Sequence, residues 1–382
     1  MTRYADLLPG DSAPWFQQRS LGNPRYAFDT AAGRYTVLCF FGSAAAPAAA
    51  ARLSAVRRRT DLFDDAFCSF FGVTMDPTDE AEKRIAESYP GYRFFLDFDG
   101  AVARRYGALP SEEAGDALGS EERIAYRPLW VLLDPTLRVL KALPFRQDGS
   151  DAAELIETLE RLPPASRFAG FELQAPILFL PNVFDRALCD RLVGLYEAHG
   201  GEESGFMREV DGKTVAVHDH AHKRRRDHVI EDQTLVKHTQ AIFLRKVVPQ
   251  IQKAHQFRVT RMERYLVGCY TAEDRGHFRA HRDNTTRGTA HRRFAVSVNL
   301  NEDFDGGEVS FPEYGPRSFK PPAGGAVVFS CSLLHAVSAV TRGRRYAFLP
   351  FLYDDAAAKI REANNAFLGE GVGQYQSAPQ TA

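Results

Sequence analysis

A histidine and an aspartate stand two positions apart in His281-Arg-Asp283, and a further histidine, His335, follows later in the chain. On a β-strand, residues i and i+2 point to the same face, so His281 and Asp283 could bind one metal ion. Two histidines and one carboxylate form a facial triad, which leaves positions open on a non-haem Fe(II). Arg345 follows His335 by ten positions and begins a predicted strand, where its planar guanidinium could bind a dicarboxylate bidentately.

These residues lie in a region that is rich in short strands. Two helices are predicted first, over Asp185–His199 and Thr234–Lys253. From about Arg258 onward, turn residues separate short apolar segments, and this order is typical of a β-sandwich or jelly roll braced by helices. The strands that we expect there are Arg261–Tyr270, Arg293–Leu300, Gly307–Phe311, Ala326–Phe329, Val337–Val340 and Arg345–Tyr353.

The first part of the chain, to about residue 165, alternates strand and helix patterns, which predicts an α/β sandwich. Predicted strands are Tyr35–Phe41, Phe67–Thr74, Leu129–Asp134 and Val139–Phe145, and predicted helices are Ala44–Arg59, Asp79–Ser88 and Asp151–Leu162. The acidic stretch Pro110–Glu122 is expected to be an exposed loop, and Leu162–Arg167 is the best linker. We therefore expect domains over residues 1–165 and 170–356 and a C-terminal tail over 357–382.

Composition excludes several classes of protein. In 382 residues, 48 Lys and Arg balance 49 Asp and Glu, which argues against general nucleic-acid binding. The sequence has no apolar run of membrane-spanning length, and its start lacks an apolar signal core. The five cysteines are dispersed without a CxxC pair, which indicates reduced thiols and a cytoplasmic location.

The second region resembles a known family through motifs that keep their order and spacing. They are Gly268-Cys-Tyr270, the stretch 276–284 around His281, the stretch 298–308 around Asn299, Pro322–Phe329, and His335–Arg345. Over residues 172–354 this set is similar to the Fe(II)/2-oxoglutarate dioxygenases of the prolyl 4-hydroxylase group. One departure is Phe278, where relatives often have a tyrosine.

This resemblance implies a double-stranded β-helix fold. It also implies hydroxylation of a substrate with O2, coupled to oxidative decarboxylation of 2-oxoglutarate, with L-ascorbate keeping the iron reduced. By the same resemblance His281, Asp283 and His335 would be the iron ligands. Arg345 would bind the distal carboxylate of 2-oxoglutarate, and Tyr270 and Asn299 would line its pocket. The substrate stays open between a protein or peptide residue and a small molecule.

The first region, over about residues 5–145, resembles peroxiredoxins of the alkyl hydroperoxide reductase and thiol-specific antioxidant group, which implies a thioredoxin-like fold. Such enzymes need a cysteine in the first turn of the helix after the Val37–Phe41 strand. By alignment on Pro47, Ala49 stands at that position. Cys39 and Cys68 lie in or beside apolar strands and are expected to be inert. We therefore expect a structural, dimerising or docking role, with a homodimer left open.

Several alternatives remain at this stage. His218-Asp-His-Ala-His222 could align three imidazoles for a second metal, but a polar loop is the preferred interpretation. The basic run Lys223–His228 is interpreted as a solvated face, with attraction of an acidic substrate as the alternative. Only one of Arg344 and Arg345 can enter the pocket, and spacing favours Arg345. Two rival functions are a scaffold with both domains inactive and a thiol peroxidase fused to a jelly roll.

Overall fold

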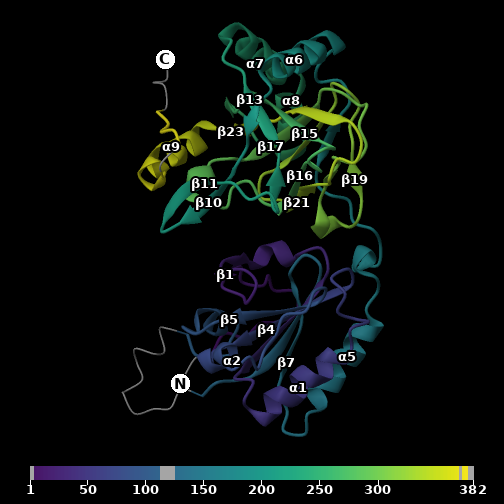
Figure 1. The fold of residues 1–382 in the computed structure, drawn as a ribbon, viewed down its shortest axis with the longest axis vertical. Helices are drawn as coiled ribbons and strands as arrows, with labels where there is room; N and C mark the ends of the chain where they lie inside the picture. Colours follow the sequence, from purple (N-terminus) through teal and green to yellow (C-terminus); the bar gives the residue numbers. More distant parts are fainter. Residues whose placement is uncertain (1–3, 112–124, 370–371, 377–382) are drawn as a thin grey trace. The chain divides into compact units, whose positions relative to one another are not determined.

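The computed structural model describes residues 4–111, 125–369 and 372–376 of the chain (Figure 1). The chain divides into two compact units, one formed by residues 1–174 with 312–316 and the other by residues 175–311 with 317–382. The predicted loop over Pro110–Glu122 lies outside the described residues from position 112 onward, as do parts of the predicted tail. None of the described helices is long and apolar enough to cross a membrane.

The first unit is built on one five-stranded sheet with the order β5-β4-β3-β6-β7. Its strands are β3 (Tyr35–Gly42), β4 (Cys68–Thr74), β5 (Tyr92–Leu96), β6 (Leu129–Leu133) and β7 (Val139–Pro144). Strands β3, β4 and β5 run parallel, whereas β6 and β7 are antiparallel to their neighbours. Every residue of β4 is buried, as expected for a strand covered on both faces.

Helices complete this sandwich. They are α1 (Pro47–Arg57), α2 (Pro77–Ala81), α3 (Ala101–Arg105) and α5 (Ser150–Arg161). A short β1–β2 hairpin (Gln17–Gln18 and Tyr26–Ala27) lies N-terminal to the sheet in sequence. A buried ion pair joins α1 to α5, because Arg52 donates from Nε and Nη2 to the two oxygens of Asp151 at 2.7 and 2.6 Å. The Trp130 indole N–H donates to the same carboxylate at 2.7 Å. The unit has the expected thioredoxin-like α/β fold.

The second unit contains two sheets that form a double-stranded β-helix. The larger sheet has the main path β14-β23-β17-β22-β15-β13-β9, with β20 and β8 continuing from β17. Its strands are β8 (Leu178–Leu180), β9 (Glu202–Glu203), β13 (Arg226–Val229), β14 (Arg261–Glu263), β15 (Leu266–Thr271), β17 (Phe294–Asn299), β20 (Ala326–Ser330), β22 (Arg344–Phe348) and β23 (Phe351–Tyr353). The smaller sheet has the order β12-β16-β21-β18-β19. Its strands are β12 (Lys223–Arg224), β16 (His277–His281), β18 (Val309–Ser310), β19 (Ser318–Phe319) and β21 (His335–Val337).

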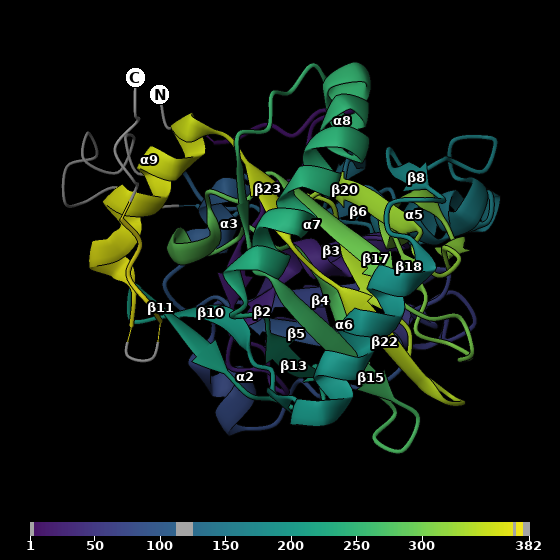
Figure 2. The same ribbon diagram turned by 90° about the horizontal axis from the view of Figure 1, so that it is seen from above.

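Three helices brace the larger sheet, as Figure 2 shows from above. They are α6 (Arg186–His199), α7 (Gln233–Lys246) and α8 (Val248–His255). Leu192 of α6 and Phe243 of α7 share one buried cluster with Val267, Val296 and Phe348 of the sheet. This apolar layer fixes the outer face of the larger sheet, so its other face is free to carry polar groups.

A separate hairpin and the C-terminal segment are joined to each other. Strands β10 (Phe206–Val210) and β11 (Lys213–Val217) form the hairpin. After helix α9 (Asp355–Ala363), the chain returns to the hairpin, where the Gly369 N–H donates to the Thr214 carbonyl oxygen at 2.8 Å. Thr214 is fully buried, which anchors this contact.

Several element boundaries differ from the sequence-based expectations. The predicted helix Thr234–Lys253 is two helices, since Pro249 cannot donate a backbone hydrogen bond and α7 ends at Lys246. The predicted helix Asp79–Ser88 is only the short α2, which is followed by Lys83 with a left-handed φ of 55°. The predicted strand Arg261–Tyr270 is interrupted at Arg264, which has φ of 63°. The predicted strand Val337–Val340 lies earlier, as β21.

Candidate metal centre

Two neighbouring strands of the smaller sheet bring the candidate metal ligands together. His281 is the last residue of β16 and His335 is the first residue of β21, and the two are direct partners across the antiparallel pair. Asp283 lies beyond the end of β16, so the expectation that both His281 and Asp283 belong to one strand is wrong. A backbone hydrogen bond from the Asp283 N–H to the Cys331 carbonyl oxygen (2.9 Å) holds the aspartate at the site instead.

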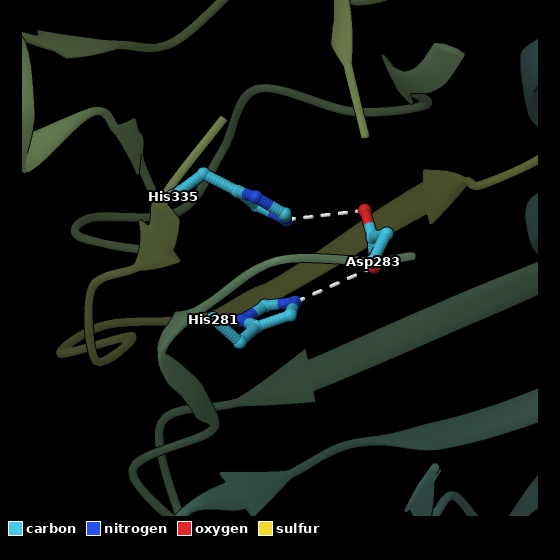
Figure 3. A group of neighbouring side chains, drawn as sticks. All are labelled: His281, Asp283 and His335. Atoms are coloured by element: carbon cyan, nitrogen blue, oxygen red, sulfur yellow. Dashed lines mark ion pairs between the residues drawn. The ribbon is translucent and has the colours of Figure 1, made fainter. Parts of the chain in front are cut away.

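The three side chains converge on one point (Figure 3). One ligand atom from each of His281, Asp283 and His335 lies within 4.8 Å of the others. His281 Nε2 is 3.6 Å from Asp283 Oδ1, and His335 Nε2 is 3.4 Å from Asp283 Oδ2. These side chains are 14%, 12% and 6% exposed, so the group is largely shielded from water yet remains accessible.

Backbone contacts fix the tautomer of both histidines. His281 Nδ1 lies 2.7 Å from the Arg279 carbonyl oxygen, and His335 Nδ1 lies 3.0 Å from the Leu333 carbonyl oxygen. A carbonyl oxygen can only accept, so each Nδ1 carries a hydrogen, and in the neutral ring each Nε2 then presents a lone pair to the site. Metal-binding histidines in proteins are typically oriented by such a contact of the other ring nitrogen.

The charge state of the group also suits a cation. Burial lowers the pKa of His281 to about 4, an effect to which the neighbouring His335 adds, so its imidazole is neutral at physiological pH. Burial alone would raise the pKa of the Asp283 carboxyl, but His335 and His281 outweigh it and hold that pKa well below its usual range. The centre therefore offers a neutral His281 imidazole and an ionised Asp283 carboxylate beside His335.

Aromatic rings hold the two imidazoles in place. Phe278 stacks on His281 with ring centroids 3.5 Å apart and an interplanar angle of 20°. Phe329 packs against His335 with centroids 4.6 Å apart. Phe278 is thus an apolar stacking partner that brings no hydroxyl to the site.

Arg345 lies on the inner side of β22, and its side chain is buried. The residue is 1% exposed, whereas the preceding Arg344 is exposed, as alternation along a strand requires. Its Nε donates to Asn299 Oδ1 at 3.1 Å and its Nη2 donates to Ser297 Oγ at 2.7 Å. Its Nη1 is buried without any hydrogen-bond partner among the described residues. Burial also lowers the pKa of this guanidinium from its ordinary value.

Tyr270 lies between two guanidinium groups. The Arg345 guanidinium carbon is 5.3 Å from the Tyr270 ring centroid, and the Arg225 guanidinium carbon is 5.7 Å from it. Arg225 Nη1 donates to the Tyr270 hydroxyl at 3.4 Å. Because that oxygen accepts from Arg225, the hydroxyl hydrogen can be donated to a further acceptor.

The basic run that begins at Lys223 is only partly a solvated face, contrary to the expectation. Lys223 and Arg225 are buried, while Arg224 and Arg226 are exposed. The alternation of strand residues is the signal that could have separated the two pairs, and it also places Asp227, two positions after Arg225, on the same side. The partner of Arg225 is Asp227, with Nε to Oδ1 at 2.6 Å and Nη2 to Oδ2 at 2.7 Å.

The three histidines of His218–His222 do not form a metal site among the described residues, where the centre above is the single group of this kind. His220 Nε2 pairs with Glu203 Oε1 at 2.5 Å. His222 instead packs against Phe206 and Phe278, with centroids 4.5 and 5.5 Å apart. The preferred interpretation, a polar loop, agrees with these contacts.

The first unit has no thiol where a peroxidase would need one. Ala49 occupies the first turn of α1 and is buried, and the helix begins after Ala46. Cys39 and Cys68 are fully buried inside β3 and β4. Burial raises the pKa of the Cys39 thiol well above its usual range, which makes it a poor nucleophile.

Comparisons with known proteins agree with this division of the chain. Residues 265–353 match the family model of the 2OG-Fe(II) oxygenase superfamily, and residues 9–139 match that of the AhpC/TSA family. The chain thus carries a 2OG-Fe(II) oxygenase domain that follows an AhpC/TSA domain.

Among individual relatives, a PKHD-type hydroxylase of Pseudomonas fluorescens is 43% identical over 91 residues, which are 22% of this chain and 39% of that protein. The chain therefore spans well under half the length of this relative. Two solved structures are also similar. A prolyl hydroxylase from Trichoplax adhaerens, in complex with a hypoxia inducible factor peptide fragment, has a TM-score of 0.39 at 16% identity and covers 49% of this chain and 86% of its own. Peroxidoxin BcpB from Mycobacterium tuberculosis has a TM-score of 0.34 at 18% identity and covers 41% of this chain and 99% of its own.

Proposed function

We propose that the second unit is an Fe(II)- and 2-oxoglutarate-dependent oxygenase that hydroxylates a C–H bond of its substrate with O2, giving succinate and CO2. The observation that carries the proposal is the pairing of two features. The largely shielded side chains of His281, Asp283 and His335 direct their ligand atoms to one point, and Arg345 is buried with an Nη1 that lacks a partner among the described residues.

The donor set fits the metal that the family implies. Two imidazoles and one carboxylate are the ligands of facial-triad Fe(II) oxygenases, and they would hold the iron here. Fe(II) bound there would supply the activation of O2 that is coupled to oxidative decarboxylation of the 2-oxo acid. Phe278 and Phe329 contact the imidazoles, so they keep water away from the ligands and restrict rotation of the rings.

The residues around Arg345 would select the cosubstrate. Many 2-oxo acids could chelate the metal, so the choice of 2-oxoglutarate has to come from a cation that binds the distal carboxylate. Arg345 offers its unpartnered Nη1 for that purpose, and Asn299 and Ser297 hold the guanidinium in position. Tyr270 would donate its hydroxyl hydrogen to the same ligand.

An anaerobic titration tests this function without knowledge of the substrate. The full chain is loaded with Fe(II), 2-oxoglutarate is added, and the visible metal-to-ligand charge-transfer band is followed. We expect a saturable band in the wild-type protein and none in His335→Ala. A wild-type protein that is folded and binds Fe(II) but gives no band would refute the proposal and favour a non-catalytic scaffold.

Other parts of the proposal rest on the family resemblance or on composition. L-ascorbate would serve as the reductant that keeps the iron ferrous. The first unit would act as a structural, dimerising or docking domain, because Ala49 replaces the reactive cysteine. The protein would be cytoplasmic, since its five cysteines are all free and buried.

A further inference from the structure

Lys223 lies next to the wall of the candidate metal centre. It pairs with Phe278 across β12 and β16, and its Nζ is 5.0 Å from the Phe278 ring centroid. Phe278 in turn stacks on His281. Lys223 is 4% exposed, and none of the hydrogen bonds in the centre itself involves it. The side chain therefore places an ammonium group close to the reaction site without a role in the function proposed above.

This ammonium has no direct ion pair among the described residues, and the carboxylate of Asp227 reaches it only through the Ser204 hydroxyl. Lys223 Nζ donates to Ser204 Oγ at 2.7 Å and to the Gly205 carbonyl oxygen at 2.6 Å, which leaves its third N–H available. The nearby carboxylate of Asp227 forms ion pairs with Arg225 (Nε to Oδ1, 2.6 Å) and Arg264 (Nη2 to Oδ2, 3.3 Å). Burial lowers the pKa of Lys223 well below its ordinary value.

The cosubstrate and the metal do not supply the missing negative charge. Fe(II) together with Asp283 would carry one net positive charge. Doubly charged 2-oxoglutarate together with Arg345 would carry one net negative charge. These four charges cancel, whereas the adjacent group of Arg225, Arg264 and Asp227 carries one net positive charge. Lys223 adds another positive charge in its protonated form, which a bound anion would stabilise. Since a buried charge needs a partner, the remaining reactant is the one that can provide it.

The rim of the site carries further cations. Arg208 on β10 lies with its guanidinium carbon 5.3 Å from the Phe206 ring centroid, and Phe206 packs on His222. Arg279 is exposed on β16, and its backbone N–H donates to the His222 carbonyl oxygen at 2.9 Å. Neither arginine forms an ion pair within the residues that the structure describes. The nearby Asp219 uses its carboxylate to accept the Ala221 N–H at 2.9 Å.

We infer that the substrate of this oxygenase is an anion whose carboxylate is bound by Lys223 beside the metal centre and attracted by Arg208 and Arg279 at the rim. The inference rests on the proposed function and adds the chemical class of the substrate. A carboxylate is favoured because the surroundings of Lys223 carry an excess of positive charge, and because an ammonium with one free N–H can form a charge-assisted hydrogen bond to it.

The test uses the full chain with Fe(II) and saturating 2-oxoglutarate under anaerobic conditions. The probes are a panel of N-acetyl amino acids, each compared with its own neutral primary amide. Binding beside the metal is measured as a shift of the charge-transfer band. We expect some carboxylates to shift the band, and their amides to bind at least about ten-fold more weakly, as loss of one charge-assisted contact implies.

Variants assign this preference to the lysine. Lys223→Met should weaken binding of the responding carboxylates about ten-fold or more, leave the amides unchanged, and change the dissociation constant of 2-oxoglutarate by less than about two-fold. Arg224→Met is the matched control, because this neighbour is exposed and should change neither value. The surface variant Arg208→Ala with Arg279→Ala, which removes no buried side chain from the core, should weaken carboxylate binding more at low salt than at high salt.

Several outcomes would overturn the inference while leaving the proposed function intact. They are amides that bind as tightly as carboxylates, a panel in which no carboxylate shifts the band, and a Lys223→Met variant that loses 2-oxoglutarate as severely as Arg345→Ala. The last result would make Lys223 a cosubstrate-binding residue. Absence of the band itself in the wild-type protein would instead refute the proposed function, and the inference with it.

Discussion

Removal of the Arg345 guanidinium should separate cosubstrate binding from metal binding. Arg345 is 1% exposed, and its Nη1 has no protein partner in the described structure. An anionic ligand would therefore meet a cation that is already desolvated and held by Ser297 and Asn299. In Arg345→Ala the distal carboxylate of 2-oxoglutarate would lose that partner, while the three metal ligands would keep their contacts.

The size of the effect follows from the burial of the pair. Loss of one partner of a desolvated charge pair costs about 2–5 kcal/mol. At about 1.4 kcal/mol for each factor of ten, the lower limit corresponds to roughly a 30-fold weaker affinity for 2-oxoglutarate. Arg344→Ala should have a much smaller effect, because the Arg344 side chain is exposed on the other face of β22.

The assay is the anaerobic titration of the Fe(II)-loaded protein with 2-oxoglutarate, together with a separate measurement of Fe(II) affinity and of thermal unfolding. Fe(II) affinity should stay close to that of the wild type in both variants. If Arg344→Ala proves the more damaging change, the assignment of the inward arginine is wrong. If neither variant alters the titration, 2-oxoglutarate is not the cosubstrate and the scaffold interpretation gains support.

Three further predictions concern the metal, the thiols and acid stability. The candidate metal ligands are His281, Asp283 and His335. Alanine substitution of each one should abolish or greatly weaken Fe(II) retention measured by equilibrium dialysis. Wild-type affinity in two of the three variants would refute the assignment. The double variant Cys39→Ser with Cys68→Ser should keep most oxygenase turnover, apart from the stability lost through buried hydroxyls. The wild-type protein should reduce hydrogen peroxide no faster than an ordinary thiol protein. A fast, cysteine-dependent reaction with peroxide would contradict this prediction. Burial lowers the pKa of His222 from 6.5 to about 4. Between these two pH values the unfolded chain binds a proton at His222 and the folded chain does not. The free energy of unfolding therefore decreases as the pH falls from 6.5 toward 4. His222→Phe should therefore make the free energy of unfolding less dependent on pH in that window, and an unchanged pH dependence would count against the assignment.

The sequence predicts the chemistry of the candidate site better than it predicts the positions of the residues. His281 and Asp283 were chosen because of strand alternation, yet only His281 belongs to β16. The two still converge, because the Asp283 N–H bonds to the Cys331 carbonyl oxygen. That contact joins residues far apart in sequence, and no local pattern encodes it. For Arg345, in contrast, alternation along β22 together with the ten-residue spacing from His335 is enough to place the side chain inside.

The burial of charged side chains is hard to predict from this sequence. A run such as Lys223–Arg226 is interpreted from composition as solvated, because most Lys and Arg are exposed. Two of its residues are nevertheless buried. Lys223 donates to Ser204, which the tertiary fold brings close from an earlier part of the chain. Arg225 donates to Asp227, only two positions later, so this pair could have been predicted from the sequence. The helix break near Val247 was missed for a different reason. Pro249 can end one helix or stand in the first turn of another, and here it stands in the first turn of α8.

The ion pair between Arg52 and Asp151 determines whether a thiol in the first unit could be activated. Arg52 lies one turn after Ala49, and each of its three side-chain nitrogens donates a hydrogen bond, with the Asp151 carboxylate and the carbonyl oxygens of Ala48 and Arg146 as acceptors. An Ala49→Cys substitution would therefore introduce a sulfur without a free cation to lower its pKa. Release of Arg52 would require a second substitution at Asp151, which costs about 3–5 kcal/mol because it leaves a buried charge alone. Neither substitution by itself would therefore give the first unit an activated thiol.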